Sequence, residues 1–397
     1  MNFFVHSKFR KIVDGFWMVP FLLIIRLIWP KKIKIYQFPS DRIGEYIPAA
    51  IKFVYSKKTT EEKIICVNKE IVSNTYWHKK IETLSEIWFM DKPNLWWWNL
   101  KLPRSKFHIF YPILENKNPT LYVTPEDEFL NFSSVEHQIA RSNLVKLGWK
   151  EGDKIVCLLV RDSKHLNETY PKNDWSYHDY RNSDIGDYAV AIDFLLKQNV
   201  WVFRMGRHTK EKLSIKNKRY IEYKDSGIES DFMDIWLFAN ADGCISNSSG
   251  LDWISVLYRK PQLFINYLPM AHILYRSTAL IYPKKLIWVK SGIELTLKEY
   301  LAHEYFHSEK YRECNIVVVN LAKEELLDGF VEFYERYLKT NECNIYINQL
   351  ESRFWHVIKS YYSFFSQSKT IFPSDNYGFH AIPSMCWLNR RSSEFFE

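Results

Sequence analysis

Short apolar runs alternate with longer segments of helical spacing from residue 33 to the end of the chain. Short apolar runs between polar turns are typical of buried strands, whereas apolar positions three or four residues apart are typical of helices. Strands are predicted at residues 33–38, 63–67, 154–160, 200–204, 219–223, 241–245 and 263–267. Helices are predicted between and after them, at 47–54, 75–84, 126–147, 185–198, 232–239, 251–258, 295–301, 324–339 and 349–365.

This alternation of strands and helices predicts an α/β fold with parallel, doubly wound sheets. A chain of 397 residues is long enough for two such domains. The turn-rich stretch GWKEGD at 148–153 separates two strand–helix series, so we place the domain boundary at residue 150. The first predicted part is an apolar N-terminal segment at 1–32. Two Rossmann-like domains follow, at 33–150 and 151–320. The last part, at 321–397, consists of helices that pack back.

The N-terminal segment is strongly apolar over residues 16–30. Pro20 and Arg26 interrupt it, and it is shorter than the roughly 20 residues that a membrane-spanning helix needs. No small-residue cleavage site follows it, which argues against a cleaved signal peptide. Two interpretations remain open: a helix lying on an anionic membrane surface, or a first helix buried in the fold. The first is favoured by the cations on both sides: Lys8, Arg10, Lys11, Lys31, Lys32 and Lys34.

Polar residues follow three of the predicted strands in the second domain, and parallel strands would bring these loops to one edge of the sheet. Two of the loops contain arginines and the third precedes a helix N-terminus, a combination that suits a diphosphate. Surface ion pairs for the arginines and an ordinary capped turn are the alternatives. The predicted ligand-binding residues are Arg161, Asp162, Arg204, Gly206, Asn247, Ser248, Ser249 and Gly250.

Composition narrows the class of protein. Aromatic residues make up 17% of the chain and the net charge is +8, which fits sugar-stacking surfaces, anionic ligands or an anionic membrane. No lysine–arginine block is dense enough to indicate nucleic acid. Six cysteines are scattered without CxxC pairs, which favours a reduced, cytoplasmic compartment. With the N-terminal segment on a membrane surface, the chain would make peripheral contact with the inner face of the cell membrane.

Two stretches carry a family resemblance: YRNSDIGDYAVAIDFLLKQNVWVFRMG at 180–206 and DFMDIWLFANADGCISNSSGLDWISVLYRKP at 231–261. Together with Arg42-Ile43-Gly44 they resemble a family of bacterial glycosyltransferases of surface polysaccharide synthesis. The resemblance implies a GT-B-like fold, in which two Rossmann-like domains face across a cleft. It places the acceptor on the first domain and the nucleotide-sugar donor on the second. The family pattern has histidine where this chain has Glu45.

The resemblance implies a transferase that moves a sugar from a nucleotide-sugar to a glycan or lipid-linked acceptor. Arg204 would stabilise the departing diphosphate, with help from Arg161. If the reaction inverts the anomeric centre, Asp41 or Glu45 would deprotonate the acceptor hydroxyl. The chain contains no DxD motif, so we expect neither a metal nor another cofactor. The alternative is a non-catalytic module that binds glycan-assembly components.

A competing motif lies at His303-Glu304-Tyr305-Phe306-His307, which matches HExxH. In zinc proteases this motif sits on a helix, where the two histidines bind the metal and the glutamate is the base. The motif lies outside the three loops described above and lacks the longer HExxHxxGxxH pattern. A zinc metalloprotease is therefore the least favoured interpretation.

Overall fold

The computed structural model describes residues 13–24, 33–58, 63–67, 71–83, 87–90, 130–162, 174–207, 209, 211–247, 249–270, 279–339, 349–365 and 381–397. The chain divides into two compact units. The first comprises Met1–Glu115 and Leu121–Asn131, and the second comprises Asn116–Thr120 and Phe132–Glu397. Each unit is described by itself.

The first unit contains a parallel three-stranded sheet in the order β1-β2-β3. Its strands are β1 (Ile33–Gln37), β2 (Lys63–Val67) and β3 (Ile87–Met90), and its helices include α2 (Ile43–Lys58) and α3 (Thr75–Glu82). The predicted strands at 33–38 and 63–67 and the two predicted helices are confirmed. Strand β3 was not predicted because its apolar run is only four residues long.

Aromatic packing holds α2 against the end of β1. The buried Phe38 ring lies 5.4 Å from the Tyr46 ring and 5.2 Å from the Phe53 ring, measured between centroids. Asn74 caps α3 by accepting a hydrogen bond from the backbone N–H of Trp77 at 2.7 Å, and the Trp77 side chain is buried. In the loop between β1 and α2, which contains Asp41, the Ser40 hydroxyl donates to the backbone carbonyl of Ile71 at 2.9 Å.

The second unit is built on a sheet of seven parallel strands in the order β12-β9-β8-β7-β4-β5-β6. Every residue of β4 is buried, as expected of a strand covered on both faces. The strands are β4 (Ile155–Leu159), β5 (Trp201–Arg204), β6 (Tyr220–Glu222), β7 (Gly243–Ser246), β8 (Gln262–Tyr267), β9 (Ala279–Pro283) and β12 (Ile382–Pro383). The predicted α/β class is confirmed.

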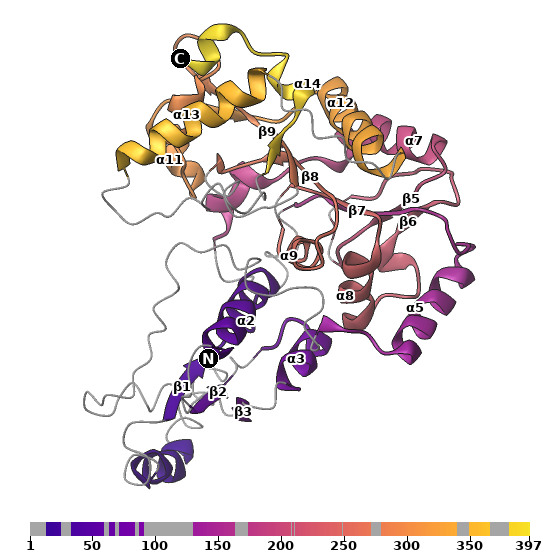
Figure 1. Ribbon diagram of the computed structural model, residues 1–397, viewed down its shortest axis with the longest axis vertical. Coiled ribbons are helices and arrows are strands. Elements are labelled where there is room, and N and C mark those ends of the chain that lie inside the picture. The colour runs from indigo at the N-terminus through magenta and orange to yellow at the C-terminus, as the bar shows by residue number, and fades with distance from the viewer. Residues whose placement is uncertain are drawn as a thin grey trace. The chain divides into compact units, whose positions relative to one another are not determined.

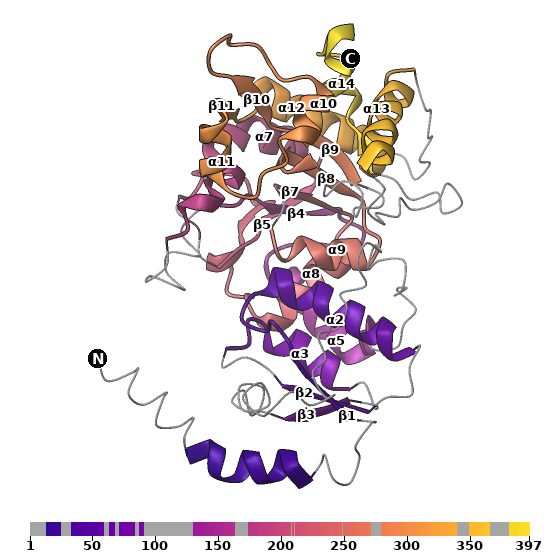
Figure 2. The ribbon, with the colours of Figure 1, turned by 90° about the vertical axis from the view of Figure 1, so that its left-hand side faces the viewer.

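Helices cover both faces of this sheet (Figures 1 and 2). Helices α7 (Ala189–Lys197) and α12 (Lys323–Phe333) lie on one face, and α8 (Asp231–Asn240) and α9 (Asp252–Leu257) lie on the other. The remaining elements are α5 (Ser134–Lys146), β10 (Lys285–Trp288), α10 (Leu297–Ala302), α11 (Ser308–Glu313), β11 (Ile316–Val319), α13 (Gln349–Phe365) and α14 (Met385–Leu388).

The C-terminal elements pack back onto the second unit. Helix α12 approaches the sheet so closely that a Cβ at Gly329 would lie 2.8 Å from Ile265 Cδ1. Phe333, at the end of the same helix, lies against Gly243 of β7. Strand β12 then pairs with β9 and extends the sheet.

Helix α5, which we expected at the end of the first domain, belongs to the second unit. Trp236 of α8 donates its indole N–H to His137 of α5 at 3.2 Å, and Phe132 packs beside Phe232 and Tyr258. Ser133 and Glu136 form a capping box at its first turn. Among the described residues, no helix is both long and apolar enough to cross a membrane.

Candidate functional site

The order of strands in the second sheet defines the place where a ligand would be expected. The chain runs from β4 outward through β5 and β6, then returns to β7 and continues outward through β8 and β9 in the other direction. This is the Rossmann order, with its switch point between β4 and β7. In such sheets, ligands bind beyond the carboxyl ends of the strands at that point.

The loop after β4 is held in place by the side chain of Asn247, which follows β7. Asn247 Oδ1 accepts a hydrogen bond from the backbone N–H of Arg161 at 2.9 Å. Its amide nitrogen donates to the backbone carbonyl of Arg181 at 3.0 Å and to Ser183 Oγ at 3.3 Å. Asn247 is one of the predicted ligand-binding residues, and its buried amide joins three segments of the protein.

The loop after β7 is organised around an internal carboxylate. Asp252, 0% exposed, accepts hydrogen bonds at Oδ2 from Ser246 Oγ (2.8 Å) and from the backbone N–H of Ser249 (2.7 Å). The N–H group of Ser249, predicted to bind phosphate, is therefore already used by the protein. Gly250 follows in the same turn, whereas Ser248 lies outside the described residues.

Arg204, at the end of β5, is a buried ion-pair partner rather than a free cation. Its side chain is 2% exposed and its Nη1 donates to Glu222 Oε1 at 3.1 Å and to the backbone carbonyl of Glu211. Glu222 also accepts hydrogen bonds from the Tyr220 hydroxyl and the backbone N–H of Leu213. The role of Arg204 at a diphosphate stays a prediction, and its Nε has no hydrogen-bond partner among the described residues.

A second arginine follows directly in the loop after β5. Gly206 has a positive φ of 111°, and the next residue, Arg207, donates to Asp231 at 2.7 Å and to Asp234 at 2.6 Å. Burial raises the pKa of Asp234 to about 6, against the opposing effect of Arg207. This ion-pair cluster attaches the β5 loop to helix α8.

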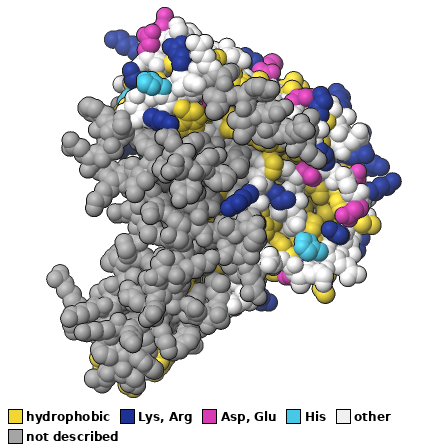
Figure 3. Space-filling model, viewed as in Figure 1, with side chains coloured by type: hydrophobic (Ala, Val, Ile, Leu, Met, Phe, Trp, Pro, Cys, Tyr) yellow, Lys and Arg dark blue, Asp and Glu magenta, His cyan; other side chains and the backbone are white. Residues whose placement is uncertain are grey.

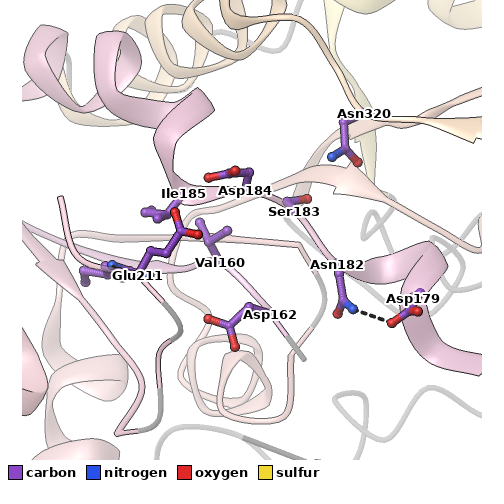
Figure 4. A pocket seen from close by; sticks show the side chains of 10 residues that line it. Val160, Asp162, Asp179, Asn182, Ser183, Asp184, Ile185, Glu211 and Asn320 are labelled. Carbon is purple, nitrogen blue, oxygen red and sulfur yellow. Dashed lines mark hydrogen bonds between the residues drawn. The ribbon is translucent and has the colours of Figure 1, made fainter. Parts of the chain in front are cut away.

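A cavity of about 390 Å³ lies where the loops after β4 and β5 meet the segment that leads into α7. Its lining is mostly polar, and Figure 4 shows how most of these side chains surround it. Four of the lining residues are acidic. The lining residues are Val160, Asp162, Asp179, Asn182, Ser183, Asp184, Ile185, Arg204, Glu211 and Asn320.

Hydrogen bonds within the lining fix the segment before α7. Asn182 donates its amide to Asp179 Oδ1 at 2.8 Å, and Asp184 accepts from the backbone N–H of Gly186 at 2.7 Å (Figure 4 shows the former). Partial burial raises the pKa of Asp179, while Arg161 lowers it. Arg161 is therefore close enough to contribute positive potential at this edge of the cavity.

Of the predicted ligand-binding residues, Asp162 and Arg204 line the cavity. Asp179, Asn182, Ser183, Glu211 and Asn320 were not predicted as site residues. Asn182 and Ser183 lie in the stretch that carries the family resemblance, so their polar character before a helix was a usable signal. For Asn320 the sequence contained no such signal, because a contact distant in sequence brings it to the cavity. The backbone N–H of its neighbour Leu321 donates a hydrogen bond to Asn266 Oδ1 at 2.8 Å.

A buried lysine lies behind the cavity wall. Lys284, which follows β9 and is 1% exposed, donates from Nζ to the backbone carbonyl of Asn182 at 2.6 Å. Burial, with a smaller contribution from the nearby Arg181, lowers the pKa of Lys284 to about 7. The lysine therefore ties the cavity-lining segment to the end of β9.

The predicted catalytic carboxylates both lie in the first unit. Asp41 is in the turn after β1, and Glu45 is in the first turn of α2. Glu45 forms an ion pair with Arg42 at 2.5 Å and is about half exposed. A role for Glu45 as a base would require this local pair to open.

The HExxH segment does not form the helix that a zinc protease requires. Helix α10 ends at Ala302, with His303 as its C-cap, and α11 begins at Ser308 after His307. His303 instead hydrogen-bonds Tyr305 at 2.8 Å, while His307 stacks on Tyr177. The metalloprotease interpretation is therefore wrong, because it requires both histidines on one helix. Among the described residues, no group of three or more potential ligand side chains could hold a metal ion.

No protein-family model matches the chain, and no curated protein matches it. Among solved structures, the E. coli ADP-heptose LPS heptosyltransferase II matches with a TM-score of 0.34 and 10% identity, covering 63% of this chain and 89% of its own. The wall teichoic acid polymerase TagF matches in one variant form with a TM-score of 0.28 and 10% identity, covering 92% of this chain and 99% of its own. Another variant form of TagF matches with a TM-score of 0.29 and 10% identity, covering 84% of this chain and 93% of its own. The chain is thus only remotely similar to these enzymes, and its proposed function rests on its own sheet and cavity.

Proposed function

We propose that this chain is a glycosyltransferase that moves a sugar from a nucleotide-sugar donor to a glycan or lipid-linked acceptor in bacterial surface polysaccharide synthesis. The observation that carries the proposal is the polar cavity beside the switch point of a Rossmann-ordered sheet. Nucleotide-bearing ligands are typical of this location. The resemblance at residues 180–206 and 231–261 points to the same class of reaction.

The lining of the cavity favours a ligand rich in hydroxyl groups. Asp162, Asp179, Asp184 and Glu211 supply carboxylate oxygens, which accept hydrogen bonds from the hydroxyls of a ribose or a sugar. Because these carboxylates would repel a diphosphate, we assign the hydroxyl-bearing part of the donor to them. The diphosphate then belongs beside the cations at the cavity edge.

Two arginines would act on the diphosphate in different ways. The charge of Arg204 is largely balanced by Glu222, so this residue contributes a directed Nε–H donor more than net charge. Arg161, close to Asp179, would add positive potential. In the proposed reaction, the acceptor oxygen bonds to the anomeric carbon while the bond to phosphate breaks. If the reaction inverts the anomeric centre, Asp41 or Glu45 of the first unit would take the acceptor proton.

A thermal-shift screen of UDP-, GDP- and TDP-sugars tests donor binding, with CMP-sugars, which carry a single phosphate, as the comparison class. A donor present at about 100 times its dissociation constant stabilises the folded state by about 2.7 kcal/mol, so one nucleotide class should raise the melting temperature by several degrees. Absence of any shift across the panel at saturating concentrations would contradict the proposal.

Arginine variants test the assignment of the diphosphate. Arg204→Ala should weaken donor binding, and unchanged nucleotide affinity would refute the assigned role. Because this change removes the cation that balances the buried charge of Glu222, Arg204→Lys and Arg161→Ala are compared with it on folded protein. The alternative function, a non-catalytic binding module, predicts donor binding without any release of nucleoside diphosphate.

A further inference from the structure

The helix over residues 13–24 in the first unit (indigo in Figure 2) exposes a continuous apolar face. Phe16 is 81% exposed and Ile24 is 53% exposed, whereas Met18 and Leu22 are buried, at 0% and 2%. At about 100° per residue, the exposed positions fall on one side of the helix and the buried ones on the other. The exposed residues are Val13, Phe16, Trp17, Pro20, Leu23 and Ile24.

This face differs from the outer face of an ordinary surface helix, which is polar. The only ionisable residue in the helix is Asp14, which is half-buried and lies beside the exposed face. On the face shown in Figure 3, the basic and acidic side chains of the described residues are interspersed with apolar ones. A group of exposed aromatic and aliphatic side chains of this kind marks an interaction surface.

The charge of the surrounding sequence identifies the partner. Residues 1–40 contain seven lysines and arginines and a single acid, Asp14, for a net charge of +6 out of +8 for the whole chain. A second copy of the chain would bring two such segments together, and their like charges would repel. An anionic lipid surface offers both apolar depth and opposite charge.

The geometry of the helix also determines how it would bind lipid. The apolar run at residues 16–30 is shorter than the roughly 20 residues that a membrane-spanning helix needs, and Pro20 and Arg26 interrupt it. Met18 and Leu22, on the other side of the helix, are buried. We propose that the helix lies in the plane of an anionic membrane, with Phe16, Trp17 and Ile24 inserted at the level of the headgroups.

Vesicle flotation of the full chain tests this proposal without donor or acceptor, so its outcome is independent of the proposed transferase activity. Vesicles of phosphatidylcholine alone are compared with vesicles that also contain phosphatidylglycerol. The wild-type chain should float with the anionic vesicles, and high salt should weaken binding. Phe16→Asn combined with Ile24→Asn should reduce the bound fraction at limiting lipid about tenfold.

Helix α5 supplies the matched control, because Val135 and Ile139 are also exposed, at 61% and 49%. Val135→Asn combined with Ile139→Asn should leave flotation unchanged. The two single variants of the N-terminal helix replace the double variant if circular dichroism shows that the latter is unfolded. Flotation equal to wild type in the folded Phe16 and Ile24 variants overturns the proposal. So does self-association that these variants abolish without any effect on flotation, since that result assigns the face to a second copy.

Discussion

Arg204 shows how the role of a single residue depends on the register of neighbouring strands. In the parallel pairing of β5 with β6, Arg204 lies directly opposite Glu222, and their side chains form a buried ion pair. The sequence predicted the arginine at the end of a strand but not its partner, because register is set by packing. The position of Asp162 does not depend on strand register in this way. Asp162 was predicted to bind a ligand, and it does line the cavity.

Replacement of Asp162 by asparagine should weaken donor binding about tenfold. The change preserves the shape of the side chain but replaces a charged acceptor, and a hydrogen bond to a charged group contributes about 1.5–3 kcal/mol. Isothermal titration calorimetry with the donor identified by the screen measures the effect. Asp193→Asn is the control, because Asp193 pairs with Lys197 on the exposed side of α7. Equal loss of affinity in both variants would contradict the assigned role of Asp162.

Lys284 should make stability depend on pH in alkaline solution. Its pKa is about 7 in the folded state and 10.5 in the unfolded state, so between these values only the unfolded chain binds the proton. The free energy of unfolding should therefore fall as pH decreases from 10.5 to 7, by at most about 1.4 kcal/mol per pH unit, and no further below 7.

Urea denaturation of the wild type and of Lys284→Met at several pH values isolates this effect, because the other titrating groups are common to both proteins. The difference in unfolding free energy, wild type minus variant, should increase from pH 7 to pH 10. A difference that stays constant over this range would show that Lys284 keeps its proton in the folded protein.

At the scale of elements, the sequence predicted most of the second sheet and its order of strands and helices. Apolar runs marked β4, β5, β7 and β8, and polar residues marked the loops that follow them. The cavity itself was only partly predictable, because its remaining lining comes from segments joined by tertiary hydrogen bonds. Asn247 fixes the segment at 181–183, and Asn266 brings Asn320 to the cavity by binding Leu321.

The HExxH segment shows that a motif in the sequence does not ensure the helix that the motif requires. Thr296 and Glu299 form a capping box that starts α10, and the helix ends before the motif begins. The two histidines therefore lack the one-turn spacing on a helix that brings zinc ligands together. Spacing in sequence alone does not specify that a helix continues.

The turn between β7 and α9 should depend on Asp252 for stability. Asp252→Ala would leave the buried Ser246 hydroxyl and the Ser249 N–H without this acceptor, at a cost of about 2 kcal/mol in unfolding free energy. Chemical denaturation measures the loss. Asp252→Asn retains one acceptor oxygen and should lose less. If alanine and asparagine have the same small effect, the carboxylate does not organise the loop.

At the scale of the whole molecule, the second unit contains both a Rossmann-ordered sheet and a polar cavity beside its switch point. The first unit contains a parallel sheet with two carboxylates after its first strand. The predicted arrangement of two domains facing across a cleft stays a prediction. In the proposed mechanism, the second unit would bind the donor and the first unit would activate the acceptor.

Donor turnover should not require a metal ion. In the proposed mechanism, Arg161 and Arg204 stabilise the leaving diphosphate, and no step uses a divalent cation. Addition of EDTA should therefore leave the rate of nucleoside diphosphate release unchanged. A loss of activity in EDTA that magnesium or manganese restores would contradict this part of the mechanism.

The central claim is that the chain breaks the bond between a sugar and a nucleoside diphosphate. The direct measurement is chromatographic detection of nucleoside diphosphate after incubation with the donor that gives a thermal shift. The account predicts slow release by the wild-type chain without acceptor, faster release with a suitable acceptor, and strong reduction in the Asp162→Asn variant. Saturable donor binding without release, with and without acceptor, would contradict the claim and identify a non-catalytic binding module.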